Sequence, residues 1–267
     1  MFKIGFIGTG NMGGALLKAA AKSVGGESIL ASDFFYEKAL KAAQEVGAAA
    51  STNEEIAKTC KYIFLGVKPQ MMNDVLKEIS PFLKERSDRF ILVSMAAGLS
   101  AKTISETSGE NIPVIRIMPN TPCGVGSGVV LYSPYGKVES SELEEFEKIL
   151  ECAGITDCIN EALIDAASAV SGCGPAFVYM FIEAMADGAV YCGLPRDKAL
   201  RYAAQTVMGA AQTLLETGQH PGALKDAVTS PGGTTIAGVR ALEKGAFRAA
   251  VTNSVIKSYE KTLELKK

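Results

Sequence analysis

The chain has 267 residues, of which 48% are hydrophobic and 21% charged, and its formal net charge is −2. This composition is typical of a globular protein with an ample core and room for two domains, and it excludes a disordered chain. Because the charge is nearly balanced, it favours neither nucleic acid nor an anionic membrane as a partner. We expect a small-molecule partner instead.

The cysteines and the single histidine point to the cellular setting. The six cysteines form no C-x-x-C pair and the only histidine is His220, so we expect no metal site. Scattered cysteines are most simply reduced thiols of the cytoplasm. Met1-Phe2-Lys3 leads directly into an apolar run and leaves no room for a signal peptide, which also favours a cytoplasmic protein. The uncharged run 166–182 approaches membrane-span length, but two glycines and a proline interrupt it, so we expect two helices and no membrane association.

The opening of the chain predicts a nucleotide site. An apolar strand runs into Gly8-Thr9-Gly10-Asn11-Met12-Gly13, and a helical pattern follows from Ala15. In such a G-x-G-x-x-G turn the glycines allow a tight bend, a close approach of backbone N–H groups to a pyrophosphate, and close packing of helix on strand. The helix N-terminus adds partial positive charge. A plain connection between strand and helix is the alternative, but a second apolar segment ends at Asp33, where a ribose-binding residue is expected.

Alternating strands and helices continue to about residue 160. Helices are predicted over 36–46, after Thr52 as N-cap, and from Pro69, and strands over 28–32, 62–67, 90–94 and 114–118, with a short apolar segment at 48–50. Residues 126–132 and 154–159, separated by an acidic helix over 139–152, look like two edge strands. The pattern predicts an α/β fold with an N-terminal Rossmann-like, doubly wound, mostly parallel sheet.

After residue 161 the pattern predicts helices only, over 161–171, 176–192, 195–216, 221–228, 234–244 and from 247 to the end. We therefore place a dinucleotide-binding domain at 1–160 and an all-helical, substrate-binding and dimerisation domain at 161–267. Its helices are apolar on more than one face, and a domain of this size often completes its core with another subunit. We expect a helical dimer interface.

Loops that follow parallel strands at their carboxyl ends are candidates for ligand contacts. Lys68, between Val67 and Pro69, could reach a phosphate or a carboxylate, although it could also be a solvated lysine. Met95-Ala96-Ala97 is small and apolar, suited to lie against a nicotinamide ring. Asn120 stands between two prolines, which present its amide stiffly.

The second domain offers a small-anion pocket. Two glycines, Gly232 and Gly233, precede the helix that begins near Thr234, and the first N–H groups of a helix have no intrahelical partner. An ordinary N-cap by Thr234 or Thr235 is an equally good interpretation of the same residues. A hydride donor with an anion pocket implies reduction of a compact carboxylate. Related hydroxyacid dehydrogenases carry a lysine a few residues into the helix after a Gly-rich turn, but Pro175–Tyr179, after Gly172-Cys173-Gly174, contains none. His220 looks like a surface connector, so a general base is missing and an imine is favoured over a hydroxy acid.

These motifs together resemble the pyrroline-5-carboxylate reductase family. The resemblance covers essentially the whole chain and rests on Gly8–Gly13, Val67–Gln70, Met118–Pro122, Ser171–Ala176 and, above all, Leu224–Glu243. The first motif is shared with many nucleotide-binding proteins, whereas the last is specific to that family. The resemblance implies NAD(P)H-dependent reduction of the C=N bond of 1-pyrroline-5-carboxylate to L-proline, the last step of proline biosynthesis, in the cytoplasm.

The resemblance also implies roles for individual residues. Ser230 and the backbone of Gly232, Gly233 and Thr234 would hold the substrate carboxylate, and the hydroxyl of Thr235, the catalytic residue, would hydrogen-bond the ring nitrogen. The residues expected to bind the cofactor are Gly8, Gly10, Asn11, Met12, Gly13, Ser32, Asp33, Asn53, Val67, Lys68, Pro69, Met95, Ala96, Ala97 and Asn120. An obligate homodimer is implied, with active sites that combine two subunits, often assembled as a pentamer of dimers.

One departure from the family bears on the cofactor, which can be NADPH or NADH. NADPH-preferring members often carry Ser, Asn or Arg at the adenosine ribose, whereas here Ser32 is followed by Asp33. A carboxylate accepts from the 2′-hydroxyl of NADH and repels a 2′-phosphate, which slightly favours NADH. Ser32 could still serve a phosphate if Asp33 turned outward. A related imine or 3-hydroxyacid oxidoreductase and a catalytically silent dinucleotide sensor are the alternative functions, and the sequence does not separate a five-membered from a six-membered cyclic imine.

Overall fold

The computed structural model describes residues 4–109 and 111–265. Met1-Phe2-Lys3, on which the expectation of no signal peptide rested, therefore lies outside the described residues. The chain divides into two compact units, one of residues 1–172 with 261–267 and one of residues 173–260. The expected domain boundary at residue 160 stays a prediction.

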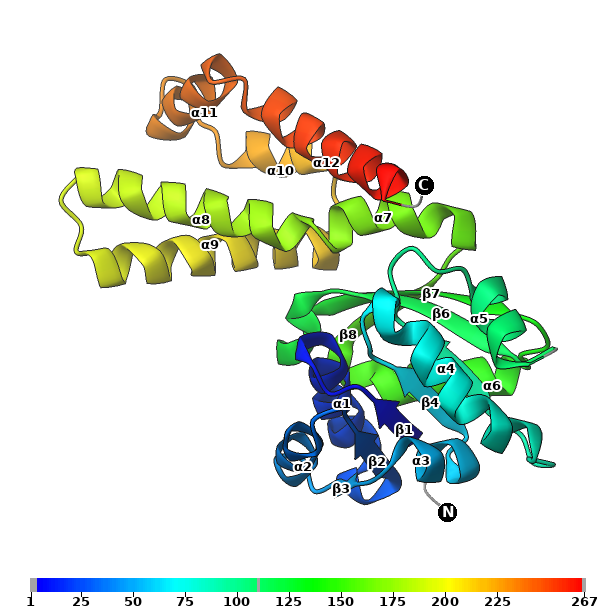
Figure 1. Ribbon diagram of the computed structural model, residues 1–267. Coiled ribbons are helices and arrows are strands. Elements are labelled where there is room, and N and C mark those ends of the chain that lie inside the picture. Colours follow the sequence, from blue (N-terminus) through cyan, green and yellow to red (C-terminus); the bar gives the residue numbers. More distant parts are fainter. Residues whose placement is uncertain (1–3, 110, 266–267) are drawn as a thin grey trace. The chain divides into compact units, whose positions relative to one another are not determined.

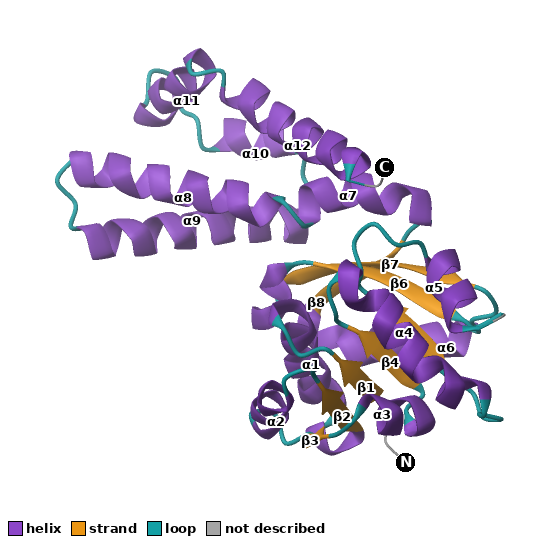
Figure 2. Cartoon of the chain, viewed as in Figure 1, coloured by secondary structure: helices purple, strands orange, loops and turns teal. Residues whose placement is uncertain are grey.

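The first unit is built on one sheet with helices on both faces (Figures 1 and 2). Its strands are β1 (Ile4–Ile7), β2 (Ile29–Ser32), β3 (Ala49–Ala50), β4 (Tyr62–Leu65), β5 (Ile91–Ser94), β6 (Val114–Pro119), β7 (Gly128–Tyr135) and β8 (Gly154–Cys158). They lie in the order β3-β2-β1-β4-β5-β6-β7-β8. The pairing is parallel except between β6 and β7. This confirms the mostly parallel, doubly wound sheet.

The strand order reverses between β1 and β4, so the chain passes from β3 back across β1. In sheets of this kind the crevice at the carboxyl ends of the two strands at the switch is where ligands bind. The prediction of two edge strands after residue 126 is half correct: β8 is an edge, but β7 is paired on both sides. An antiparallel β7 is possible because a short connection, not a crossover helix, joins it to β6.

Consecutive strand residues face opposite layers, which is why the strands read as continuous apolar runs. Phe6 and Phe64 pack with α1 (Asn11–Val24), α2 (Tyr36–Gln44) and α6 (Ser140–Leu150) on one face. Ile7 and Leu65 pack with α3 (Asn53–Thr59), α4 (Pro69–Lys84) and α5 (Ala101–Ser108) on the other. The rings of Phe6 and Phe64 stack at 4.5 Å between centroids. Thr52 caps α3 as predicted, because its hydroxyl accepts from the N–H of Glu55.

The chain after residue 160 forms helices, as expected. These are α7 (Ile164–Ser171), α8 (Gly174–Tyr191), α9 (Arg196–Thr217), α10 (Pro221–Ala227), α11 (Thr234–Lys244) and α12 (Phe247–Glu264), after a single 3-10 turn, Glu161–Leu163. Within the part of the chain that the structure describes, one helical stretch, Glu161–Tyr191, is long and apolar enough to cross a membrane by length and composition alone, and 11% of its apolar window is buried. A turn at Gly172 and Cys173 divides that stretch into α7 and α8, which confirms two helices.

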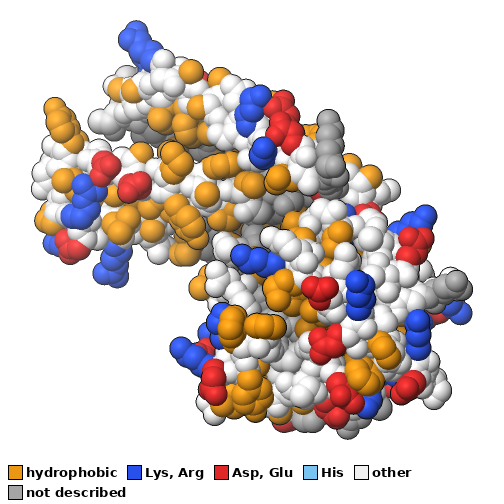
Figure 3. Space-filling view, in the orientation of Figure 1, with side chains coloured by type: hydrophobic (Ala, Val, Ile, Leu, Met, Phe, Trp, Pro, Cys, Tyr) orange, Lys and Arg blue, Asp and Glu red, His pale blue; other side chains and the backbone are white. Residues whose placement is uncertain are grey.

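The helical unit buries little by itself. Among the residues that the structure describes, its hydrophobic core cluster consists of Ala186, Ala199 and Ala203. Larger apolar side chains are exposed instead, for example Tyr179, Met180, Met208, Leu215 and Ile256. Hydrophobic side chains are accordingly spread over the surface of α8 and α9 (Figure 3). An exposed apolar surface of this kind on paired helices is typical of an interface between subunits.

Candidate functional site

The Gly-rich turn between β1 and α1 has the shape that a pyrophosphate requires. Gly8 adopts φ +97°, and a Cβ there would lie 2.8 Å from the Gly66 backbone. A Cβ on Gly13 would lie 2.1 Å from the Gly8 carbonyl oxygen, so only glycine allows this close packing. A Cβ on Gly10 would instead project into open space, where a ligand can approach. Gly10 is the N-cap of α1 and no side chain caps that helix, which leaves its first N–H groups available to an anion.

Asp33 is held against this turn. Its Oδ2 accepts from the N–H of Thr9 at 2.8 Å and from the Thr9 hydroxyl at 3.1 Å, while Oδ1 accepts from the N–H of Phe35 at 3.1 Å. The Ser32 hydroxyl is buried and donates to Oδ1 of Asn53 at 2.6 Å. In this structure the carboxylate therefore faces the turn, and the serine that could have served a phosphate faces the interior.

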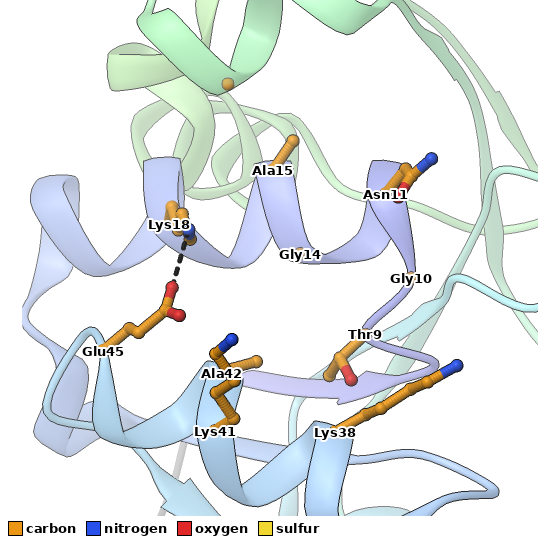
Figure 4. Close-up of a pocket in the computed structure, with 11 residues that line it drawn as sticks. Thr9, Gly10, Asn11, Gly14, Ala15, Lys18, Lys38, Lys41, Ala42 and Glu45 are labelled. Atoms are coloured by element: carbon orange, nitrogen blue, oxygen red, sulfur yellow. Dashed lines mark ion pairs between the residues drawn. The ribbon is translucent and has the colours of Figure 1, made fainter.

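Two hollows flank the turn. The first, of about 480 Å³, lies between α1 and α2 and is lined by Thr9, Gly10 and Asn11 together with lysines (Figure 4). Lys18 forms an ion pair with Glu45 at 2.7 Å, and Lys38 and Lys41 reach the same hollow from α2. The second, of about 220 Å³, is lined by Gly8 and Asp33, and Asn53 and Val67 are also among its lining residues.

The other loops at the carboxyl ends of the strands differ in how they present their predicted residues. Lys68 is the N-cap of α4, contributes no side-chain cap and is exposed, with Pro69 as the first residue of the helix. Ala97 is exposed and Met95 half-buried, so both are accessible to a ligand. Ala96 is buried and packs in the core layer of α4 and α5, so its side chain anchors the loop to the core and does not face a ligand.

Asn120 is tied into the fold. Its Nδ2 donates to the carbonyl oxygen of Ser171 at 2.9 Å, and its Oδ1 accepts from the N–H of Val129 at 2.9 Å. The side chain thus joins the end of β6 to β7 and to the last residue of α7. These bonds lie within the protein, and contact with the cofactor stays a prediction.

A buried ionic cluster that was not predicted lies one strand away from the Met95–Ala97 loop, because Arg116 pairs with Ser94. Arg116, 3% exposed, lies in β6 and places Nη1 3.1 Å from Glu161 and Nη2 3.5 Å from Asp165. The same oxygen of Glu161 accepts from the N–H of Ala101, the first residue of α5, at 2.8 Å. The cluster therefore fixes the helix that follows Met95 to the segment that leads into α7. An arginine inside an apolar strand was the signal that could have revealed it.

The turn before α11 is open, as an anion pocket requires. Gly233 is the N-cap of α11 and no side chain caps the helix, so the alternative in which Thr234 or Thr235 caps it is wrong. Gly232 adopts φ +67°, and a Cβ on Gly233 would lie 2.3 Å from the Ser230 hydroxyl oxygen. The hydroxyl of Ser230 and the first N–H groups of α11 therefore lie close together, and Thr235 is exposed next to them. His220 caps α10 through Nδ1, which accepts from the N–H of Gly222 at 3.1 Å.

Comparison with known proteins covers both units. A family model described as pyrroline-5-carboxylate reductase dimerisation matches residues 161–265, and one described as NADP oxidoreductase, coenzyme F420-dependent, matches residues 3–98. The pyrroline-5-carboxylate reductase of Escherichia coli (strain K12) is 43% identical over 99% of this chain and 98% of its own length. That of Methanosarcina acetivorans is 42% identical over 99% of this chain and 98% of its own length.

Solved structures agree with the sequence comparison. Plasmodium falciparum pyrroline carboxylate reductase, solved with NADP bound, is similar with a TM-score of 0.86 and 33% identity, over 100% of this chain and 98% of that chain. A pyrroline-5-carboxylate reductase from Coxiella burnetii gives a TM-score of 0.91 at 29% identity, over 99% of this chain and 98% of that one. The likeness extends over both units, the sheet and the helices alike.

Proposed function

Because this chain belongs to the pyrroline-5-carboxylate reductase family, we propose that its Gly-rich turn and its Pro231–Thr235 turn serve one reaction, the reduction of 1-pyrroline-5-carboxylate to L-proline. The chain is an oxidoreductase that uses a nicotinamide dinucleotide, and the reaction is the last step of proline biosynthesis. A bound nicotinamide dinucleotide would supply the hydride for the carbon of the C=N bond. The nitrogen of the protonated imine keeps its proton, so hydride addition gives the secondary amine of proline directly.

The uncapped N-terminus of α11 is the observation that carries the assignment of the substrate site. With Gly233 as N-cap, the backbone N–H groups at Thr234 and Thr235 have no side-chain acceptor. They can donate to a carboxylate, which the positive end of the helix also favours. The Ser230 hydroxyl lies beside them and supplies a further donor. A compact carboxylate is thereby held by backbone atoms, without a lysine or an arginine.

The Thr235 hydroxyl positions the other end of the substrate. From the first turn of α11 it can form a hydrogen bond with the ring nitrogen while the carboxylate rests on the backbone N–H groups. A threonine hydroxyl is too weak an acid to protonate an imine by itself, so its role is to orient the ring. An iminium carbon is already electrophilic, and the reaction therefore needs no general base of the kind that alcohol oxidation uses.

The cofactor-binding residues proposed are those predicted from the sequence, with Gly8, Gly10 and Gly13 at the pyrophosphate. The preference for NADH over NADPH rests on Asp33, whose carboxylate lies at the turn and accepts from Thr9. A 2′-phosphate placed there would meet like charge. Steady-state kinetics with both cofactors tests this, and a kcat/KM more than tenfold higher for NADPH would overturn it.

We also propose that the chain works in the cytoplasm as a homodimer, and that five such dimers can assemble into a decamer. The support is the match of residues 161–265 to the dimerisation model and the small core of the helical unit. Light scattering of the purified protein distinguishes a monomer, a dimer and a decamer by mass.

The deciding experiment follows oxidation of the cofactor at the nicotinamide absorbance with 1-pyrroline-5-carboxylate, its six-membered homologue, and several 3-hydroxy and 3-keto acids. We expect turnover with the cyclic imines only. Turnover with a 3-keto or 3-hydroxy acid would favour the related dehydrogenase, and binding of dinucleotide without any turnover would favour a sensor.

Substitution of Thr235 tests its role within that reaction. Thr235→Ala should lower kcat/KM for the imine about tenfold or more, which corresponds to ~1.4 kcal/mol of transition-state binding, with little change in cofactor affinity. Thr235→Ser keeps a hydroxyl and should retain most of the activity. Unchanged kinetics in Thr235→Ala would remove the residue from the site.

A further inference from the structure

Arg116 places a charge in an otherwise apolar layer of the sheet. Val114, two residues before it in β6, packs in the core layer of α4 and α5. Because alternate residues of a strand face the same side of a sheet, Arg116 faces that layer too. Its partner in the register is Ser94, the last residue of β5. The arginine is therefore one strand away from the point at which the Met95–Ser100 loop begins.

The guanidinium of Arg116 is poorly satisfied. Nη1 donates to Oε1 of Glu161 at 3.1 Å, and Nη2 lies 3.5 Å from an oxygen of Asp165. Within residues 4–109 and 111–265, Nε and Nη2 form no hydrogen bond, although both atoms are buried. A buried ion pair with unsatisfied donors adds little stability, and apolar residues of similar size often replace one without loss. Stability is therefore a poor explanation for a charge at this position.

Glu161 connects the arginine to the start of α5. The oxygen that accepts from Arg116 also accepts from the N–H of Ala101 at 2.8 Å. Ala101 is the first residue of α5, and its N–H is one of the donors that a helix cannot satisfy internally. The N-cap, Ser100, accepts from the N–H of Thr103. Glu161 thus binds the donor that the cap leaves over.

The bond to Ala101 fixes the second end of the loop that is predicted to contact the nicotinamide ring. At the first end, the N–H of Met95 donates to the last carbonyl group of β4 at 3.4 Å. Between the two ends Ala97 is exposed and Gly98 adopts φ +80°, and a Cβ on Gly98 would meet no atom of the described residues within 4 Å. The exposed part of the loop is therefore positioned by the bonds at its two ends and by the packing of Ala96.

We propose that Arg116 and Glu161 are positioning residues of the reductase: they hold the start of α5 so that the Met95–Ser100 loop presents a fixed surface to the nicotinamide ring. The proposal rests on the proposed function, because it takes this loop as the nicotinamide contact. A displacement of about 1 Å near reacting atoms can cost on the order of a hundredfold in rate. The Gly-rich turn, which is proposed to hold the pyrophosphate, keeps its own contacts. Loss of the cluster should therefore lower kcat without weakening the binding of ADP-ribose.

The first test needs no cofactor. Amide hydrogen exchange of the full-length protein, followed by mass spectrometry, compares Glu161→Ala with Glu161→Gln, which keeps an oxygen for both donors. We expect exchange in the peptide 95–103 to be about tenfold faster in the alanine variant and close to that of the unmodified protein in the glutamine variant. Glu142→Ala is the control, because it removes a buried carboxylate paired with Arg89, which precedes β5 at the other end of that strand. Unchanged exchange in Glu161→Ala, or equal acceleration in the control, would overturn the proposal.

The second test separates positioning from binding. At saturating cofactor and 1-pyrroline-5-carboxylate, Glu161→Ala should lower kcat about tenfold or more, while calorimetry should find ADP-ribose affinity within about twofold of that of the unmodified protein. Glu161→Gln should recover most of kcat. Arg116→Lys keeps the charge but loses the forked geometry, so its kcat should fall between those of the two Glu161 variants. Glu142→Ala should retain the kcat of the unmodified protein.

The outcomes distinguish this proposal from the proposed function. Turnover by the unmodified protein that Glu161→Ala leaves unchanged, or that Glu142→Ala lowers equally, would overturn the positioning role alone. If Glu161→Ala does not fold, Arg116→Lys decides, and a kcat equal to that of the unmodified protein overturns the role. Absence of turnover by the unmodified protein would overturn the proposed function and the positioning role together.

Discussion

The two units of this chain bury their apolar side chains in opposite ways. The first unit, which contains the sheet and is called the nucleotide unit here, fully buries large residues such as Phe6, Phe64 and Phe146, in layers on both faces of the sheet. The helical unit has a core cluster of three alanines, and many of its larger apolar side chains, such as Met180, Tyr191 and Leu215, are exposed. A sheet covered by helices on both faces buries its apolar side chains within one chain. Long helices with two apolar faces can bury only one of them within the unit and need a second surface for the other. The first unit is therefore a self-contained domain, and the second is half of an interface.

The charged groups follow the same division. In the nucleotide unit, Arg116 and Glu142 are buried, and each is paired with charges from other elements. In the helical unit the ion pairs lie in water, as in Arg196 with Asp187 and Arg248 with Glu243. Exposed pairs contribute little to stability, so the helical unit gains little from them. We therefore expect the helical unit to gain most of its stability from association with another subunit.

The largest expected effect comes from placing charges on the exposed apolar surface of the helical unit. Met180→Glu with Ile256→Glu, at positions 69% and 46% exposed, should dissociate the oligomer and lower activity about a hundredfold, because a buried unpaired charge costs several kcal/mol. Size-exclusion chromatography with light scattering, together with the reductase assay, measures both. Val125→Glu with Ile155→Glu, at positions 79% and 61% exposed in the nucleotide unit, is the control and should remain assembled. An assembled, active helical variant would contradict the interpretation of that surface.

A smaller effect is expected from opening a cavity in the nucleotide unit. Phe64→Ala removes a fully buried ring that stacks on Phe6 and should lower the free energy of unfolding by about 3–5 kcal/mol in urea titrations. Phe34→Ala, which removes an exposed ring from the same unit, should change it by less than about 0.5 kcal/mol. Similar losses in both variants would show that the sheet unit is less tightly packed than its burial indicates.

Acid should weaken the nucleotide unit through Glu142. The hydrogen bond from Arg89 holds the pKa of this carboxyl below its ordinary value, so its contribution is complete at neutral pH and is lost as the pH falls through the lowered pKa. Arg89→Met should cost about 1–3 kcal/mol at neutral pH and flatten the fall in stability on acidification. Urea titrations between pH 7 and pH 3 measure it. Arg196→Met, which breaks an exposed pair in the helical unit, should leave the pH dependence unchanged.

The smallest expected effect is the loss of one helix cap. Thr52→Ala removes the acceptor for the N–H of Glu55 and should destabilise the nucleotide unit by about 1 kcal/mol. Thr52→Ser keeps the acceptor and should remain within a few tenths of the unmodified protein. Urea titration monitored by circular dichroism resolves the difference, and equal stability of the alanine and serine variants would show that water replaces the cap.

Local pattern was enough for most of the fold. Each of the strands up to Val114–Pro119 is a short apolar run between turn residues, and each helix carries its apolar residues at helical spacing, so both could be recognised without knowledge of the neighbours. The limits of β7 were less well predicted, because it extends to Tyr135 by pairing with the whole of β6. The end of a strand depends on how far its partner strand extends, and the residues of the strand itself do not show this.

Individual site residues show the same limit. The glycines of the Gly8–Gly13 turn were predictable, since close backbone approach excludes other residues there. The contact of Asn120 with the cofactor stays a prediction, whereas the bond from its amide to the Ser171 carbonyl oxygen, 51 residues away in the sequence, was not predicted. Arg116 was given no role, and its partners lie 45 and 49 residues further along the chain. Such contacts depend on where distant segments come to lie.

By itself the sequence determined the order of strands and helices, the two glycine-rich turns and the family, because each of these is recorded in residues that are neighbours along the chain. Only the tertiary structure decided that Asp33 faces Thr9, that Gly233 and not a threonine caps α11, and that Phe34 lines a hollow with three carboxylates. The physical reason is that a side chain's partners are chosen by packing among segments far apart in the sequence, and packing has no signature within any one of them.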